Sequence, residues 1–175
     1  MNISGKTFRP VISLLAVAVA LAVTGLLASP AVAQSDDEVA PTITSVAITS
    51  NPGGDNTYGA GDHIDIAVTF SEEVYIRGAG SVQLGLDIGG ESQLATFTNN
   101  TTSNWHSTVT LRYTVQVGDV DTNGVSITAN SFRQVNKPGG KEENPIQDHA
   151  GNVADLSHDA LPDDSSHQVN APGGL

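Results

Sequence analysis

The sequence predicts an all-β protein, an antiparallel β-sandwich of about seven to eight short strands preceded by a signal-peptide helix. Apolar residues recur at every second position in several segments, and turns rich in glycine and asparagine separate those segments. After the N-terminal apolar stretch, no segment of useful length shows a helical period. Because alternate side chains of a strand lie on one face, each such segment can bury one face and leave the other in water.

The first 33 residues have the pattern of a secretory signal peptide. Lys6 and Arg9 precede an apolar run over 11–28, and Ala31-Val32-Ala33 forms an A-x-A cleavage site. The alternative is an uncleaved membrane anchor, because the run is about long enough to span a bilayer. The polar chain that follows favours cleavage after Ala33. We therefore expect an exported protein, extracellular, periplasmic or at the cell surface, with no membrane insertion after cleavage.

The remaining chain is expected to form one domain. We expect an acidic N-terminal linker at 34–41, the sandwich domain at 42–170 and a flexible tail at 171–175. The formal net charge of the 175 residues is −12, and loss of Lys6 and Arg9 makes it −14 (5 − 19). Such acidity disfavours nucleic acid and anionic lipid as partners and attracts divalent cations. The alternative is that the acidity only keeps an exported protein soluble. The absence of cysteine excludes a disulfide.

Strands are expected in the following order along the chain. The three clearest alternations are Ile64–Phe70, Val82–Ile88 and Val109–Val117. Weaker strands are expected at Thr42–Thr49, Glu73–Arg77, Ser92–Thr98, Gly124–Ala129 and Ser166–Asn170. Between Arg133 and Ser165 the chain is polar and lacks alternation, and a short strand near Val153–Leu156 is expected within it.

Several motifs resemble, in their order, the bacterial immunoglobulin-like repeats of large secreted surface, adhesion and swimming-motility-associated proteins (SwmB-type repeats). They are Tyr58–Ile64, Phe70–Val74, Leu84–Gly89, Leu111–Val115, Gly118–Asp121, Val125–Asn130, Ile146–Asn152 and His167–Val169. The resemblance covers roughly residues 41–169. It implies an immunoglobulin-like β-sandwich used in adhesion or as a spacer, without catalytic residues. The chain departs from the repeats in holding one copy, in an insertion at Ser103–His106 and in a long loop at Lys137–Asn144.

A possible calcium site lies in Asp119-x-Asp121-x-Asn123-Gly124. Three oxygen-bearing side chains at alternate positions before a glycine match the first half of an EF-hand loop. The twelfth position is Asn130 instead of glutamate, so the loop is not an EF-hand. The alternative is a tight turn in which Asp and Asn bond to their own backbone.

Asp148 opens a second acidic loop, Asp148-His149-Ala150-Gly151-Asn152. In repeats of the resembled family, acids in end loops bind calcium near a domain junction. A local turn, with Asp148 bonding to its own backbone and Gly151 at positive φ, is the competing interpretation. Glu72, just after Phe70, could approach either this loop or the Asp119 loop. Calcium is thus the one cofactor that the sequence suggests.

Trp105 lies in a polar stretch, Asn99–Ser107, that we expect to be a loop. An exposed indole there would be a stacking platform for a sugar, as in a carbohydrate-binding module. The alternative is that the indole folds back over the core edge, since burial removes a large apolar area from water.

No catalytic motif is recognised, so the chain is expected not to be an enzyme. The three histidines of the C-terminal third lack zinc-site spacing, and neither HExxH nor G-x-S-x-G occurs. The leading functional prediction is a non-enzymatic module that binds an extracellular protein or a glycan. A carbohydrate-binding module using Trp105, or an exported hydrolase with an unrecognised site, are the alternatives.

Overall fold

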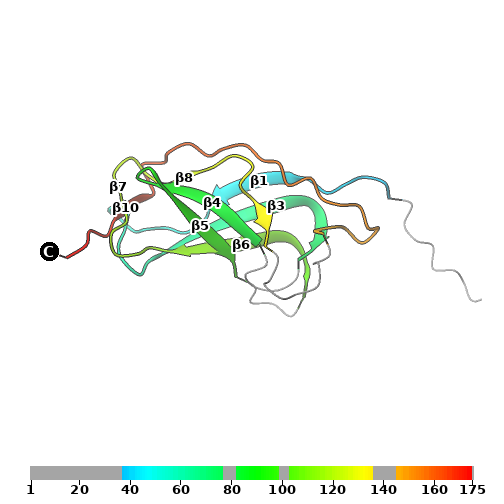
Figure 1. Ribbon diagram of the computed structural model, residues 1–175, viewed down its shortest axis with the longest axis horizontal. Coiled ribbons are helices and arrows are strands. Elements are labelled where there is room, and N and C mark those ends of the chain that lie inside the picture. Colours follow the sequence, from blue (N-terminus) through cyan, green and yellow to red (C-terminus); the bar gives the residue numbers. More distant parts are fainter. Residues whose placement is uncertain (1–36, 77–81, 99–102, 136–144, 175) are drawn as a thin grey trace, which may run out of the picture. The chain divides into compact units, whose positions relative to one another are not determined.

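A computed structural model describes residues 37–76, 82–98, 103–135 and 145–174, and this part of the chain is all-β, without a helix (Figure 1). None of these residues belongs to a helix able to cross a membrane. The strands are β1 (Ile43–Ile48), β2 (Thr57–Tyr58), β3 (His63–Tyr75), β4 (Val82–Ile88), β5 (Glu91–Phe97), β6 (Trp105–Thr114), β7 (Val120–Asp121), β8 (Ser126–Ile127), β9 (Arg133–Gln134) and β10 (Gln168–Asn170).

Most strands belong to one curled sheet in the order β1-β3-β6-β5-β4-β8, with β9 also paired to β4. All neighbours in this sheet are antiparallel. A smaller sheet has the order β2-β10-β7, in which β10 is parallel to β2 and antiparallel to β7. The prediction of an all-β, antiparallel fold is confirmed, whereas the sandwich and its immunoglobulin-like arrangement stay predictions.

The core consists of the apolar sets that the alternation predicts. Side chains on one face of β3, β4 and β6 are buried, and they join one hydrophobic cluster with residues of β5, β8 and β10. The members from the three long strands are Ile64, Ile66, Val68, Phe70, Val74, Val82, Leu84, Leu86, Ile88, Val109, Leu111 and Tyr113. The intervening polar residues lie on the outer face, where Arg112 and Asp65 form a cross-strand ion pair with two hydrogen bonds of 2.6 and 2.7 Å.

Strand β3 joins two segments that we expected to be separate. Its pairing with β6 shifts register between Thr69 and Val74, so the chain continues as one strand with an irregular stretch. Glu72 lies in that stretch and is half-buried. Because of this irregularity, the side chain of Glu72 does not point in the direction that a regular strand would give it.

Four local predictions differ from the structure. Val117 is 69% exposed, because β6 ends at Thr114 and the chain turns at Gly118, whose φ is +109°. Residues 153–156 form isolated bridges instead of a strand, since Val153 pairs only with Gln147, and Asp155 only with Thr42. The two further differences concern length: β8 covers only Ser126–Ile127, and β6 begins at Trp105, within the stretch expected to be a loop.

The two predicted end segments are partly tied to the domain. In the expected linker, the carbonyl of Pro41 accepts a hydrogen bond from the Asp155 amide at 2.8 Å. In the expected tail, Ala171 is buried and donates its amide to the Asp119 carbonyl at 2.8 Å. The predicted signal peptide with its cleavage site at Ala33, and the long loop at 137–144, lie outside the described residues.

Candidate functional site

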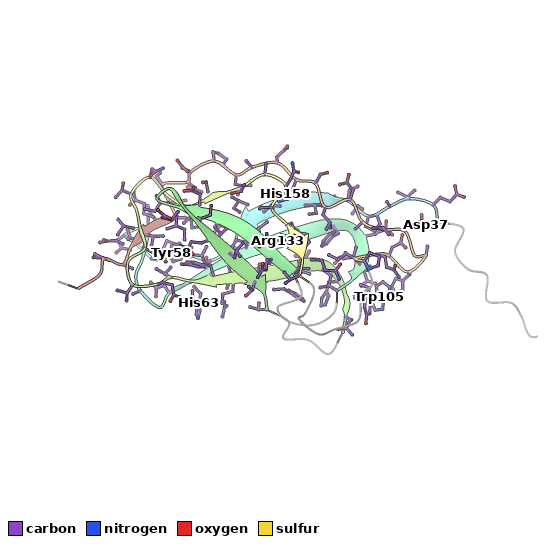
Figure 2. All side chains as sticks on the ribbon, viewed as in Figure 1. Asp37, Tyr58, His63, Trp105, Arg133 and His158 are labelled. Atoms are coloured by element: carbon purple, nitrogen blue, oxygen red, sulfur yellow. The ribbon has the colours of Figure 1, made fainter. Side chains whose placement is uncertain are left out.

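Three carboxylates from separate segments meet at one end of the domain. Asp37 precedes β1, and Glu72 lies in the irregular part of β3. Asp148 is the first residue of the acidic loop 148–152. One oxygen of each lies within 4.8 Å of the others, and no other such group of three possible ligands occurs among the described residues. We call these three residues the acidic cluster; Figure 2 labels Asp37.

Hydrogen bonds from its own loop fix Asp148. Its Oδ1 atom accepts from the Gly151 amide at 2.7 Å and the Asn152 amide at 2.9 Å, while Oδ2 accepts from the Asn152 side chain at 2.8 Å. Gly151 has a φ of +98°, which permits this turn. The turn interpretation of Asp148 is confirmed, and the same geometry holds its carboxylate in place within the acidic cluster.

The loop also positions Asp37. The Asn152 side-chain amide donates to the carbonyl of Asp37 at 2.8 Å and to that of Val39 at 3.3 Å. These bonds tie the segment before β1 to the Asp148 loop. A single asparagine therefore places two members of the acidic cluster beside each other.

The protonation of the acidic cluster reflects both burial and repulsion. Burial raises the pKa of Glu72, and the negative charges of Asp37 and Asp148 raise it further. Burial also acts to raise the pKa of Asp148, but the hydrogen bonds from Asn152, Gly151 and Ala150 outweigh it and lower this pKa. One fixed, ionised carboxylate thus lies beside two others. Oxygen ligands of this kind suit a hard divalent cation such as Ca²⁺, which would offset the repulsion.

The Asp119 loop uses its oxygens differently. The Asp119 Oδ2 atom accepts from the Tyr113 hydroxyl and the Gln116 amide, both at 2.7 Å. Asp121 is buried and accepts from three backbone amides: Gly89 at 2.8 Å, Gly124 at 2.8 Å and Asn123 at 3.1 Å. These bonds are those of a tight turn, the alternative interpretation of this motif.

The predicted ligands Asp119, Asp121 and Asn123 do not join Asp148. The Asn123 side chain instead donates to the carboxylate of Asp163. Asp121 in β7 pairs with β10, which in turn pairs with Tyr58 in β2. Figure 2 shows Tyr58 at the opposite end of the domain from Asp37.

Trp105 is the first residue of β6 and stacks on the imidazole of His149. The two ring centroids are 3.6 Å apart with planes 15° from parallel, and the ring of Tyr75 packs edge-on at 5.3 Å. His149 also lies 3.5 Å from the carboxylate of Glu73. One face of the indole is thus occupied by the imidazole, and a sugar ring would have to displace His149 to stack there.

His158 and His167 lie in other parts of the domain. The Nε2 atom of His158 accepts from the backbone amides of Ser131 at 3.1 Å and Phe132 at 3.2 Å. His167 Nδ1 lies 3.0 Å from the Tyr58 hydroxyl, which is also 2.7 Å from the Ser50 hydroxyl and donates to the Ser50 carbonyl at 3.2 Å. Burial raises the pKa of Tyr58, so its hydroxyl stays protonated between them.

His106, the residue after Trp105, has a half-buried imidazole. Its Nε2 atom is buried without a hydrogen-bond partner among the described residues, and its ring packs edge-on against Phe97 at 5.3 Å. Burial lowers the pKa of His106; a hydrogen bond with the Ser103 backbone and the charge of Glu73 oppose this only in part.

We expect His106 to make the domain less stable in acid. Because its pKa is lower in the folded state, the unfolded chain binds the proton more readily, and stability falls as the pH drops below the unfolded value of about 6.5. The variant His106→Phe keeps an aromatic ring but cannot take up a proton, so it should lack this part of the acid-induced loss of stability. Urea unfolding of both proteins at pH 7.5 and pH 5 tests the difference, and an equal loss in both would contradict it.

The described residues define an all-β protein built on a curled antiparallel sheet, with an acidic cluster at one end. No protein-family model, no curated protein and no solved structure matches this chain. The likeness to bacterial immunoglobulin-like repeats is a resemblance of sequence motifs.

The sequence pointed to only part of the acidic cluster. Asp148 was predicted as a ligand from its acidic turn motif, and Glu72 was expected near one of the two acidic loops. Asp37 gave no signal beyond lying in an acidic segment, because its position depends on the hydrogen bond from Asn152. The acidic cluster and the Asp119 turn contain the same residue types. They differ in the groups around each carboxylate, which are other carboxylates in the cluster and hydrogen-bond donors in the turn.

Proposed function

We propose that the chain is a secreted, non-enzymatic immunoglobulin-like module for binding or structural presentation at the cell surface, stabilised by calcium. The observation that supports calcium is the acidic cluster, whose three carboxylates come from three segments and lie within 4.8 Å. Its partner is an extracellular protein or a glycan. The signal-peptide pattern and the family resemblance support the cellular location and the binding role.

Calcium would act by joining segments that are far apart in sequence. Asp37 leads into the edge strand β1, and Glu72 belongs to β3. Asp148 belongs to a loop that is hydrogen-bonded both to the Asp37 segment and to β3. In the folded state these carboxylates repel one another, whereas in the unfolded chain they are apart. A cation that binds only the folded arrangement therefore stabilises it by mass action.

Thermal unfolding in calcium and in chelator tests this proposal. At a calcium concentration 100 times Kd, the stabilisation is about 2.7 kcal/mol, which corresponds to a rise in Tm of roughly 5 to 10 °C for a domain of this size. The variant Glu72→Gln should lose most of this rise because it removes a charged ligand. Glu38→Gln, which removes one charge from an exposed residue outside the cluster, is the matched control.

The outcome separates specific binding from general screening of an acidic protein. Equal Tm values in calcium and chelator would refute calcium stabilisation. An equal response of wild type, Glu72→Gln and Glu38→Gln would place any cation elsewhere. Magnesium at the same concentration controls for ionic strength and should raise Tm less, because Mg²⁺ keeps its water ligands more tightly.

A further inference from the structure

A groove of about 490 Å³ runs along the free edge of β1. β1 ends the order of strands in the large sheet: β3 pairs with it on one side, and on the other it pairs with no strand of the described residues. Residues 43–46 of β1 line one side of the groove, and residues 157–159 with Leu161 line the other; Ala129 and Asn130 complete the lining.

The segment opposite β1 is anchored at both ends. Before the groove, the Asp155 amide donates to the Pro41 carbonyl at 2.8 Å. After it, Leu161 and Ile127 exchange two backbone hydrogen bonds of 3.0 and 3.1 Å. Between these points the His158 ring accepts two backbone amides of the facing turn. The segment is thus held beside β1 without pairing with it along the groove, and the opening is preformed.

Backbone hydrogen-bonding groups of β1 point toward the groove. The Thr49 amide donates to the Asp65 carbonyl at 2.8 Å, so the backbone groups of Thr49 face β3. The backbone groups of successive residues in a strand point to alternate sides, so those of Val46, three residues earlier and opposite Val68, face away from β3. The N–H and C=O of Val46 therefore point away from β3, toward the side of the groove.

β1 lacks most features that protect an edge strand from pairing. Its sequence, Ile-Thr-Ser-Val-Ala-Ile, contains no charge and no proline and is rich in β-branched residues. Within the strand itself, an irregularity between Ile43 and Ser45 is the one feature of this kind. This composition suits the addition of another strand.

The shape of the groove selects an extended chain as its occupant. The segment 157–161 flanks β1, and in a second copy of the chain the same segment would flank the same strand. The two β1 edges could therefore not come together. A single extended peptide fits between the two sides, and four residues of β1 correspond to about 13 Å of strand. Asp159 is the one acidic residue of the lining, which holds no lysine or arginine, and the whole chain carries a formal net charge of −12. Charge complementarity therefore favours a basic peptide.

We propose that this groove binds an extended, basic peptide segment of a partner protein by strand addition to β1. The peptide backbone pairs with the N–H and C=O of Val46, and its basic side chains lie near Asp159. This inference rests on the proposed binding function, for which it names the site and the class of partner.

A synthetic octapeptide tests the site directly. The probe is a blocked peptide of alternating threonine and valine with a lysine at each end, and its analogue with glutamate at each end is the matched control. We expect the lysine peptide to bind more tightly and to slow hydrogen exchange of the Val46 amide. Unchanged exchange at Val46, or equal binding of both peptides, would overturn the proposal.

Two variants of the full chain locate the binding. Val46→Pro removes the outward N–H without removing a donor from the β1–β3 ladder, and should weaken peptide binding about tenfold or more. Asp159→Lys should weaken binding of the lysine peptide about two- to fivefold at low salt. Glu91→Lys, which makes the same charge change at the first residue of β5, should have a smaller effect.

Comparable binding by Val46→Pro and wild type would refute strand addition, and equal losses in Asp159→Lys and Glu91→Lys would refute charge recognition at the groove. If Val46→Pro does not fold, the Asp159→Lys comparison and the Val46 exchange measurement decide. The calcium response of Tm is measured on the same samples. A chain that responds to calcium and ignores the peptide would refute this inference alone.

Discussion

Replacing Asp121 by alanine is expected to lower the free energy of unfolding by roughly 3 kcal/mol or more, because each buried donor left without a partner costs about 1 to 3 kcal/mol. The buried carboxylate accepts the amides of Gly89, Asn123 and Gly124. It thereby joins the turn between β4 and β5 to the turn after β7. Urea unfolding followed by circular dichroism measures the loss.

Two further variants make this expectation specific. Asp121→Asn keeps one acceptor oxygen, so its free energy of unfolding should fall by only roughly 1 to 2 kcal/mol. Asp87 is an aspartate of the same hairpin that accepts one exposed amide, from Gly90 at 2.8 Å, so Asp87→Ala should lose only about 0.5 to 1 kcal/mol. A similar loss for Asp87→Ala and Asp121→Ala would contradict the role of the buried carboxylate.

The Asp121 variants also separate the two acidic loops. If Asp121 is a structural acceptor, its loss lowers stability by the same amount in calcium and in chelator. If it bound calcium, the loss would be larger in calcium, as expected for Glu72→Gln. The comparison therefore tests which loop holds the cation, independently of how stable each variant is.

The long strands could be predicted because burial of one sheet face imposes a period of two over many residues. Ile64–Phe70, Val82–Ile88 and Val109–Tyr113 bury their alternate side chains as expected. The period fails at Val117, which is apolar and in phase but follows the end of β6 and lies in water. Strands of two residues, such as β7 and β9, are too short to show any period.

The candidate site could be predicted only in part, because the same residue types serve two purposes. A carboxylate in a turn either accepts backbone amides or holds a cation, and Asp121 and Asp148 both accept amides from residues two to four positions later. What distinguishes Asp148 is the approach of Asp37 and Glu72, which are far away in sequence. Such tertiary contacts leave no local pattern.

Replacing Gly124 by alanine is the second change expected to have a large effect. Gly124 has a φ of +102°, and a Cβ atom there would lie 1.9 Å from the carbonyl oxygen of Asp164. That oxygen belongs to the backbone and cannot rotate away as a side chain can. The chain around residue 164 leads into β10 through His167, whose carbonyl accepts the Val125 amide at 3.0 Å.

We expect Gly124→Ala to lower the free energy of unfolding by roughly 3 kcal/mol or more, from backbone strain and the clash together. Gly118→Ala is the matched control, since Gly118 has a φ of +109° and its added Cβ would meet no atom within 4 Å. That variant should lose only about 1 to 2 kcal/mol, from backbone strain alone. The difference between the two, measured by urea unfolding, isolates the close approach of the two backbones. Equal losses would show that Gly124 is required for its φ alone and that the chain at Asp164 yields to a methyl group.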